Sequence, residues 1–351
     1  MPLQAATDSA RQDAPAPGAA VAVLGEALVD VFADGRRVPG GAPFNVARWL
    51  AAFGVNTLLI SRISSGDDAG RLLQAEMQRV GLHRRGLQLD DQHPTGVVHV
   101  LPDAQGHRFE IAADSAWDHI DATPALPLMQ ALAPGVVCFG TLALRHPASR
   151  TALATLVQGT AALRFADLNL RAVEGLRALA QQALELADWV KVNDDELQQL
   201  LAWFVDGSAA PPLPGSTAHT QAVAALVRRF GVQRLIVTRG AQGWYAVDAR
   251  GCTDLQGPAL PVDPVQDTVG AGDAFAATVL AACLQGQPLA QALAAAARLA
   301  AAVCTWPGAL PADAGVIAHW RALLGLGSAA AGGPASTPPP PLTRPAPGPC
   351  A

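Results

Sequence analysis

The fold is best interpreted from the stretch Pro264-Val-Gln-Asp-Thr-Val-Gly-Ala-Gly-Asp-Ala-Phe-Ala-Ala-Thr278. A loop ends at Gly270-Ala271-Gly272, and an apolar helical run begins at about Asp273. The first turn of a helix has backbone N–H groups without partners and carries partial positive charge. Because glycine lets an anion approach the backbone closely, this stretch predicts a phosphate site.

Asp273 is unexpected at such a site, because a carboxylate weakens the binding of a resting anion. It is useful there if it accepts a proton from a hydroxyl that attacks the anion. The alternative is that Asp273 only stabilises the helix dipole, as aspartate often does in a first turn. A dinucleotide fingerprint is excluded, because Phe275 stands where that motif needs a small residue.

The composition excludes several classes of protein. The chain has 351 residues, half of them hydrophobic, so one large domain or two ordinary ones are possible. The formal net charge is -5 with no basic block, which argues against nucleic acid as a partner. The single lysine, Lys191, lies between two valines and therefore cannot belong to a P-loop. The signature motifs of protein kinases are absent as well.

The cysteines and the ends of the chain suggest where the protein works. The five cysteines are scattered, and neither Cys-x-x-Cys nor His-Glu-x-x-His occurs, so we expect reduced thiols and no zinc site. The first twenty residues lack the apolar core of a signal peptide, and Ala274–Leu284 is too short to span a bilayer. We expect a cytoplasmic protein with no membrane partner. We also expect a disordered leader over 1–19, a folded domain over 20–326 and a disordered tail over 327–351.

Strands and helices alternate along the folded part. Strands are expected at Val21–Leu24, Thr57–Ile60, Val136–Phe139, Arg164–Ala166, Trp189–Val192, Arg234–Thr238 and Trp244–Val247. Helices are expected at Phe44–Phe53, Asp68–Val80, from about Ala148, from Asp194, at Thr220–Phe230, at 273–285 and at 288–304. This alternation predicts an α/β fold with a mostly parallel sheet and helices on both faces. Gly96–Leu101 and His107–Ile111 predict instead a hairpin of a small separate sheet.

Candidate polar residues are expected at the carboxyl ends of the strands. They are Asp30, Asn169, Asn193, Thr238 and the Gly270 loop. In a parallel sheet this edge is where ligands bind. The shared position favours a functional interpretation of these residues over an incidental one.

Gly40-Gly41-x-x-Asn45 precedes a helix and is either a flexible turn or a polyol site. Paired glycines allow close approach, and the Asn45 amide offers hydroxyls both a donor and an acceptor. Asp30 would accept from two further hydroxyls. Arg171, just past an expected strand, is either a surface cation or a ligand for a phosphoryl or acidic group.

Two further segments have a structural and a functional interpretation. Asn193-Asp-Asp-Glu196 begins a helix, where asparagine is a good N-cap and acids favour the first turn. It could also organise hydrated Mg²⁺ beside phosphates, because Mg²⁺ keeps several waters and acids can act through them. Thr238 to Gly243, which includes Gly240, joins two strands as a hairpin turn or as a shelf for a nucleotide.

Together, these motifs resemble the ribokinase-like (PfkB) family of carbohydrate kinases. Gly25–Asp30 is similar to the family's first strand with its sugar-contacting aspartate, and Gly40–Ala47 resembles its first signature in fructokinase-like form. Asp167–Arg171 is similar to the Asp-x-Asn-x-Arg of fructokinase and ketodeoxygluconate kinase members. Asn193-x-x-Glu196 matches the motif linked to Mg²⁺ and phosphate, and Asp267–Asp273 resembles the second signature.

The resemblance implies a three-layer αβα sandwich with a small β lid built from about 31–39 and 95–112. It implies ATP as co-substrate and Asp273 as general base, with the amides of Gly270–Asp273 forming an anion hole. Mg²⁺ would be held by Glu196 through water. The nucleotide would be contacted by Asn193, Thr238, Gly240 and Gly243, and the sugar by Asp30, Gly40, Gly41, Asn45 and Arg171. A monomer or a lid-mediated homodimer, and a monovalent cation such as K⁺ near the Asp267-Thr268 loop, are implied at the same level.

The expected function is ATP-dependent phosphorylation of a sugar hydroxyl, with fructose as the leading substrate. The chain departs from the family at Ser64–Asp68, a looser form of its Val-Gly-x-Asp segment, and at Phe109-Glu110, where keto-acid kinases tend to carry Tyr-Arg. The second departure argues against a keto acid. The open alternatives are a 2-keto-3-deoxygluconate kinase, another sugar or nucleoside kinase, and a non-catalytic sugar- or nucleotide-binding regulator.

Overall fold

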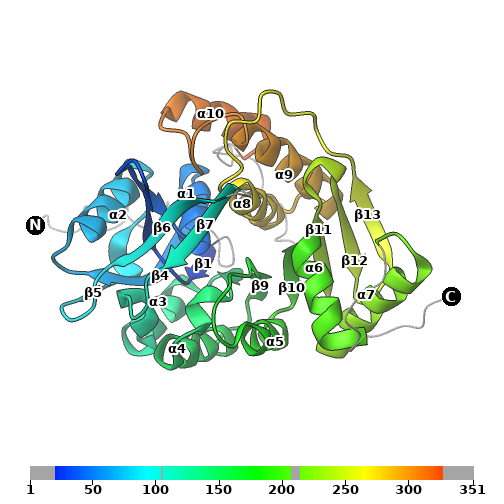
Figure 1. Ribbon diagram of the computed structural model, residues 1–351, viewed down its shortest axis with the longest axis horizontal. Helices are drawn as coiled ribbons and strands as arrows, with labels where there is room; N and C mark the ends of the chain where they lie inside the picture. The colour runs from blue at the N-terminus through cyan, green and yellow to red at the C-terminus, as the bar shows by residue number, and fades with distance from the viewer. Residues whose placement is uncertain (1–19, 104–105, 207–213, 327–351) are drawn as a thin grey trace, which may run out of the picture.

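The computed structural model describes residues 20–103, 106–206 and 214–326. The leader predicted over 1–19 and the tail predicted over 327–351 lie outside the described residues. So do 207–213, in a predicted loop, and 104–105, in the predicted hairpin turn. Within the described part, a large sheet lies between two layers of helices, with a small sheet beside it (Figure 1).

In the part of the chain that is described, the central sheet has nine strands in the order β13-β12-β11-β10-β9-β8-β1-β4-β5. They are β1 (Ala20–Leu24), β4 (Asn56–Ser64), β5 (Leu87–Asp90), β8 (Val136–Phe139), β9 (Leu163–Asp167), β10 (Trp189–Asn193), β11 (Arg234–Thr238), β12 (Trp244–Asp248) and β13 (Thr253–Gly257). The strands from β11 to β5 pair in parallel, and among the described strands only β12 runs the other way, antiparallel to both β11 and β13. The predicted mostly parallel sheet is confirmed.

Helices cover both faces of this sheet (Figure 1). One layer contains α1 (Ala42–Ala52), α2 (Asp68–Arg79), α8 (Ala271–Leu284), α9 (Leu289–Val303) and α10 (Ala314–Leu323). The other contains α3 (Ala122–Leu132), α4 (Pro147–Gln158), α5 (Leu176–Leu186), α6 (Asp194–Leu201) and α7 (Thr217–Phe230). Successive side chains of a strand point to opposite faces, so Val21 and Val23 enter the first core while Ala22 and Leu24 enter the second.

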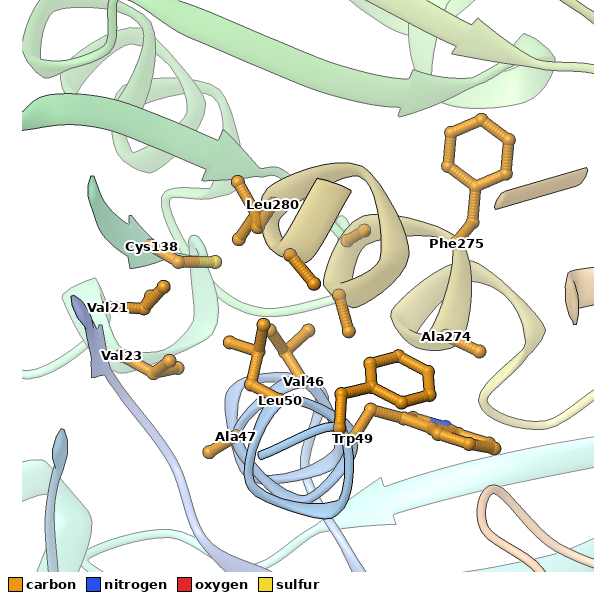
Figure 2. Close-up of a cluster of buried hydrophobic side chains, with 14 of the residues drawn as sticks. Val21, Val23, Val46, Ala47, Trp49, Leu50, Cys138, Ala274, Phe275 and Leu280 are labelled. Carbon is orange, nitrogen blue, oxygen red and sulfur yellow. The ribbon is translucent and has the colours of Figure 1, made fainter. Parts of the chain in front are cut away.

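Helices α1 and α8 share one buried cluster. Val46 and Leu50 of α1 lie beside Leu280 of α8, over Val21 of β1 (Figure 2). Helix α8 is buried on all sides from Ala274 to Ala282, which explains why its sequence is apolar all round. This packing brings the amino-terminal ends of the two helices together, although they lie more than two hundred residues apart in the chain.

The small sheet has the order β3-β2-β6-β7, from β2 (Leu28–Phe32), β3 (Arg37–Gly40), β6 (Gly96–Asp103) and β7 (Gly106–Ile111). The predicted hairpin is confirmed as β6–β7, whereas the central pair, β2 and β6, runs parallel. The position expected for Asp30 was wrong. It lies in the middle of β2, in the small sheet, because the chain leaves the central sheet at Gly25 and starts a new strand at Leu28.

Some elements were not expected from the sequence. They are the helices α3, α5 and α10 and the edge strands β5 and β13. The edge strands are short or half exposed, which removes the continuous apolar run that marks a buried strand. No helix of the described residues has the length and apolar character needed to cross a membrane.

Candidate active site

A cavity of about 1020 Å³ lies between the small sheet and the central sheet. Its walls include Asp30 of β2, Asn45 of α1, the Arg171 segment after β9 and the start of α8. The predicted site residues that line it are Asp30, Gly41, Asn45, Asn169, Arg171, Asn193, Glu196, Thr238, Gly240, Gly243, Gly270, Ala271, Gly272 and Asp273. The fold therefore gathers at one cavity residues that are spread over most of the chain.

Gly40 does not line the cavity but lies beneath Asp30. A Cβ atom on Gly40 would stand 2.3 Å from Asp30 Oδ2, so glycine is needed to make room for that carboxylate. Gly41 is the N-cap of α1 with a φ of 98°, and a Cβ atom there would meet the Glu26 carbonyl oxygen at 2.7 Å. Both glycines permit close packing, as the sequence indicated, but they pack against the protein itself.

The amino-terminal end of α8 forms the floor of the cavity. Gly270 is its N-cap in the left-handed conformation, with a φ of 79°. A Cβ atom on Gly270 would lie 2.2 Å from the Cβ of Ala309, so no other residue fits there. The amide of Ala271 donates to the Thr268 carbonyl at 3.3 Å, whereas first-turn amides such as those of Gly272 and Asp273 have no partner within the helix. These last two amides are the ones best suited to an anion.

Asp273 is half-buried and is held in place by Asn45. The Asn45 Nδ2 atom donates to Asp273 Oδ2 at 2.7 Å. Burial, together with repulsion from Asp167, raises the pKa of Asp273 to about 6, although the Asn45 hydrogen bond and the charge of Lys191 act to lower it. A carboxylate with such a pKa is ionised at neutral pH and is still basic enough to accept a proton.

Behind Asn45 lies an ion pair that the sequence analysis missed. Arg48 is buried, donates to Asn45 Oδ1, and also donates to Glu76 Oε1 at 2.7 Å and to the Pro39 carbonyl at 3.2 Å. Arg48 and Glu76 come from α1 and α2, so no local pattern could have paired them. One N–H and one lone pair of the Asn45 amide are thus already in use, which leaves one N–H and one lone pair for a ligand.

Two acids, the buried Glu26 and the half-buried Asp30, define the end of the cavity beneath the small sheet. Burial raises the pKa of Asp30 to about 6, with Arg171 acting against the shift. Burial also raises the pKa of Glu26 to about 7, and Glu26 Oε2 makes no hydrogen bond within the described residues. An unpaired buried carboxyl oxygen facing a cavity is suited to a polar ligand. Glu26 was not predicted, although an acid directly after a buried strand was a usable signal.

A second network lies beside the α8 terminus. Lys191 Nζ donates to both carboxylate oxygens of Asp167, at 2.9 and 3.0 Å, in neighbouring strands β10 and β9. Burial acts to lower the pKa of Lys191, but the charge and hydrogen bonds of Asp167 outweigh it and raise the pKa. The sequence analysis used Lys191 only to exclude a P-loop. Its nitrogen would lie 3.3 Å from a Cβ atom on Gly272, so the cation stands next to the proposed anion site.

The N-cap interpretation of Asn193 is confirmed. Asn193 Oδ1 accepts from the Glu196 amide at 2.8 Å, and Glu196 Oε2 accepts from the Asn193 amide at 2.9 Å. Glu196 Oε1 accepts in addition from the Leu170 amide at 2.8 Å. Each oxygen of Glu196 therefore accepts one backbone amide and keeps a second lone pair, with which it could accept a hydrogen bond from water.

The segment from Thr238 to Gly243 is a hairpin connection and also part of the cavity wall. It joins the antiparallel strands β11 and β12, and Thr238 Oγ1 donates to the Val192 carbonyl at 3.3 Å.

The side chain of Arg171 is exposed at the cavity, and its positive charge acts to lower the pKa values of Asp30, Glu26 and Asp273. For the Thr238–Gly243 connection and for Arg171, the structural interpretation therefore does not exclude the functional one.

Comparison with known proteins places this site in context. Residues 21–313 match the model of the pfkB family of carbohydrate kinases. A fructokinase from Salmonella typhimurium is 33% identical over 275 residues, which is 75% of this chain and 84% of that protein. An aminoimidazole riboside kinase from the same species is 29% identical over 311 residues, which is 83% of this chain and 90% of that protein.

Solved structures agree with the sequence relatives. The ATP complex of an uncharacterized sugar kinase from Pyrococcus horikoshii is 25% identical, with a TM-score of 0.68 over 82% of this chain and 93% of that one. Aminoimidazole riboside kinase from Salmonella enterica, solved with its riboside and an ATP analogue, is 26% identical, with a TM-score of 0.67 over 86% and 99% of the two chains.

The αβα sandwich, the small sheet and the cavity between them define a ribokinase-like, ATP-dependent carbohydrate kinase. The chain belongs to the pfkB family of carbohydrate kinases.

Proposed function

We propose that this chain is a fructokinase, which transfers the γ-phosphoryl group of ATP to a hydroxyl of fructose. The observation that supports the proposal most is that Asp273, the first turn of α8 and the two acids Asp30 and Glu26 face one cavity. Support for fructose comes from the fructokinase relatives, at 33% identity over three quarters of the chain.

In the proposed reaction, Asp273 accepts the hydroxyl proton while the hydroxyl oxygen forms a bond to the γ-phosphorus. The bond from that phosphorus to the oxygen bridging the β-phosphate breaks, and ADP leaves with the electron pair. The amides of Gly272 and Asp273 stabilise the charge of the transferring group. Lys191, fixed by Asp167, adds positive charge beside it. Asn45 holds the Asp273 carboxylate in one orientation before the sugar arrives.

The sugar is proposed to bind beneath the small sheet. Asp30 and Glu26 have pKa values raised to about 6 and about 7, so both can accept hydrogen bonds, and Glu26 can also donate near neutral pH. The β7 side chains that line the cavity, Phe109 and Ile111, are apolar. They offer no charge to a substrate carboxylate, which favours a neutral sugar over a sugar acid. Arg171 is left to contact a phosphoryl group.

The nucleotide is proposed to lie along the Thr238–Gly243 connection and the first turn of α8. The related sugar kinase from Pyrococcus horikoshii, which has this fold, was solved as a complex with ATP. Mg²⁺ would be held through water by Glu196, whose oxygens already accept backbone amides, and it would neutralise phosphate charge. All the positions named in the sequence analysis for the nucleotide line the cavity.

A monovalent cation and a lid-mediated dimer remain proposals. Asp267 Oδ1 and Oδ2 accept the amides of Val269 and Gly308, and each oxygen retains a second lone pair with which it could face a cation. Phe109 on β7 is about half exposed, so the small sheet has apolar surface for a second copy of the chain. Replacing K⁺ by Na⁺ in the assay tests the first proposal, and light scattering tests the second.

ADP release with a panel of acceptors tests the proposed function. The panel contains fructose, glucose, ribose, 2-keto-3-deoxygluconate and aminoimidazole riboside, each at a fixed ATP concentration. We expect the highest kcat/KM with fructose. A higher value with the riboside would favour the second candidate, a nucleoside kinase, which the 29% identical relative suggests. Binding of ATP without turnover of any acceptor would favour a regulator and contradict the proposal.

A further inference from the structure

Three side chains meet at the base of the β6–β7 hairpin, outside the cavity. His93 lies three residues before β6, and Asp114 lies three residues after β7. His119 ends the short helix η3 (Ala116–His119), which belongs to the main body of the molecule. The group therefore joins the chain segments entering and leaving the hairpin to the domain on which the small sheet rests. None of the residues in the proposed phosphoryl-transfer site takes part in it.

The potential ligand atoms of these residues are close enough to share one ion. His119 Nε2 lies 2.7 Å from Asp114 Oδ1, and His93 Nε2 lies 3.9 Å from the same oxygen. All three ligand atoms lie within 4.8 Å of one another. In a tetrahedral zinc site with bonds of about 2.05 Å, ligand atoms stand about 3.3 Å apart. The observed separations, 2.7 and 3.9 Å, fall on either side of that value, so side-chain rotations without a backbone shift can bring the three atoms to one ion.

Asp90 orients His93 as a carboxylate orients a metal-bound histidine. His93 Nδ1 lies 3.1 Å from Asp90 Oδ2, which assigns the ring proton to Nδ1 and leaves the Nε2 lone pair facing Asp114. Asp90 is buried and fixed by Arg62 and by the Gln92 and His93 amides. Metal-bound histidines almost always have such a partner on the other ring nitrogen.

Asp114 is ready to act as an anionic ligand. Its Oδ1 atom is the oxygen that the Nε2 atoms of both histidines approach. The backbone of Asp114 has a φ of 52°, a conformation that few non-glycine residues adopt. Its side chain is 69% exposed, whereas those of His93 and His119 are 23% exposed, so an ion and a water molecule can enter from that side.

The donor set selects the class of ion. Two imidazole nitrogens and one carboxylate suit Zn²⁺ and its neighbours among the transition metals, whereas Mg²⁺ prefers oxygen ligands.

The rings of His93 and His119 stack at 3.7 Å, so they must turn out of the stack before both lone pairs can converge. His146 lies beyond His119, but its Nδ1 accepts the Ala148 amide of α4, so we do not count it as a ligand.

We propose that His93, Asp114 and His119 bind a divalent transition metal ion of the Zn²⁺ class, with water in the fourth position. The bound ion ties the two ends of the β6–β7 hairpin to the main domain. Chain spacing hides this site, because its ligands come from two loops and a short helix and form no motif.

The test is a metal titration of the full chain, with its purification tag removed and without Mg²⁺. Co²⁺ is added first, because its visible absorption reports tetrahedral or five-coordinate nitrogen and oxygen ligands, and Zn²⁺ is then used to displace it. We expect saturation at one ion per chain. His119→Phe keeps a ring in the stack but removes a ligand, and it should abolish saturable uptake. Asp114→Asn should weaken binding at least tenfold, and Asp90→Asn about 10- to 100-fold.

A matched control separates this site from general histidine binding. His83 is exposed and makes no side-chain cap in the helix η2 (Arg84–Gly86), so His83→Ala should leave the titration unchanged. Hydrogen exchange should slow on Zn²⁺ addition in peptides covering 91–96 and 112–119 of the wild-type chain, and not in His119→Phe. Uptake that is equal in wild type and His119→Phe, or that is lost in His83→Ala, would overturn the proposal. Thermal unfolding without metal verifies that each variant is folded.

Discussion

The Asn45 side chain donates a hydrogen bond of 2.7 Å to Asp273, and these two residues, in the first turns of α1 and α8, lie 228 positions apart in the chain. The contact exists because α1 and α8 pack side by side against β1 (Figure 2). It links the two sequence motifs that resemble the family signatures. Asn45 is in turn held by Arg48 and Glu76, so the orientation of the proposed base depends on a buried polar chain.

Replacement of Asp273 by asparagine should lower kcat by about 10²- to 10⁴-fold, because the proton acceptor is lost while the shape is kept. Dissociation constants for fructose and ATP should change little, as measured by calorimetry. Asp195 also lies in the first turn of a helix but is exposed, so Asp195→Asn is a matched control that should keep normal kcat. A kcat for Asp273→Asn near that of the control would remove Asp273 from the role of base.

The pH dependence of the reaction should report Asp273. The base works only when ionised, so kcat should fall as the pH drops through about 6, the raised pKa of Asp273. Because the Asn45 hydrogen bond lowers that pKa, Asn45→Ala should move the acid limb to higher pH, with a greater loss of activity at pH 6 than at pH 9. Asn56→Ala, outside the cavity, should not move it. An unchanged limb in Asn45→Ala would contradict the assigned contact.

Glu26→Gln should stabilise the ligand-free protein at pH 8 and have little effect at pH 5. The folded-state pKa of Glu26 is raised from 4.5 to about 7, so ionisation destabilises the folded protein as the pH rises between these values. A shift of that size corresponds to about 3 kcal/mol of unfolding free energy as an upper limit. Urea unfolding at the two pH values measures the difference. Equal effects at both would show that the Glu26 charge is not the cause.

The same Glu26 variant should bind its sugar less well. A glutamine cannot ionise, and its amide offers a different set of donors and acceptors to the hydroxyls. We expect a raised KM for the sugar with an unchanged KM for ATP, since Glu26 lies at the end of the cavity beneath the small sheet. A variant that gains stability while its KM for the sugar rises would show the usual trade-off between stability and function at a buried site.

Gly270→Ala should disrupt the phosphate site far more than an ordinary glycine substitution. A φ of 79° costs about 1–2 kcal/mol for a residue with a side chain, and the new methyl group would meet Ala309 at 2.2 Å. Gly286 has nearly the same φ, 75°, with no atom within 4 Å of an added Cβ, so Gly286→Ala carries only the conformational cost. We expect kcat/KM for ATP to fall at least tenfold in Gly270→Ala alone. Comparable kinetics in the two variants would contradict the argument.

Much of the fold follows from local patterns. The apolar runs of β1, β8 and β11 were visible because these strands are largely buried on both faces. The β6–β7 hairpin was visible from its alternating sequence on either side of a turn. The edge strands β5 and β13 were missed because one side is exposed and the run is interrupted. Asp30 was placed in the wrong sheet, because the sequence shows a polar residue after an apolar run but not that the chain begins a new strand at Leu28.

The sequence by itself determined which residues could carry chemistry: the glycines before α8, Asp273 in its first turn, and the capping pair Asn193 and Glu196. These are local features, since caps and turns depend on neighbours within one helical turn. Only the tertiary structure decided which groups meet, such as Asn45 with Asp273, Lys191 with Asp167, and His93 with Asp114 and His119. It also decided how acidic the buried carboxyls are, because desolvation depends on what the whole fold packs around them.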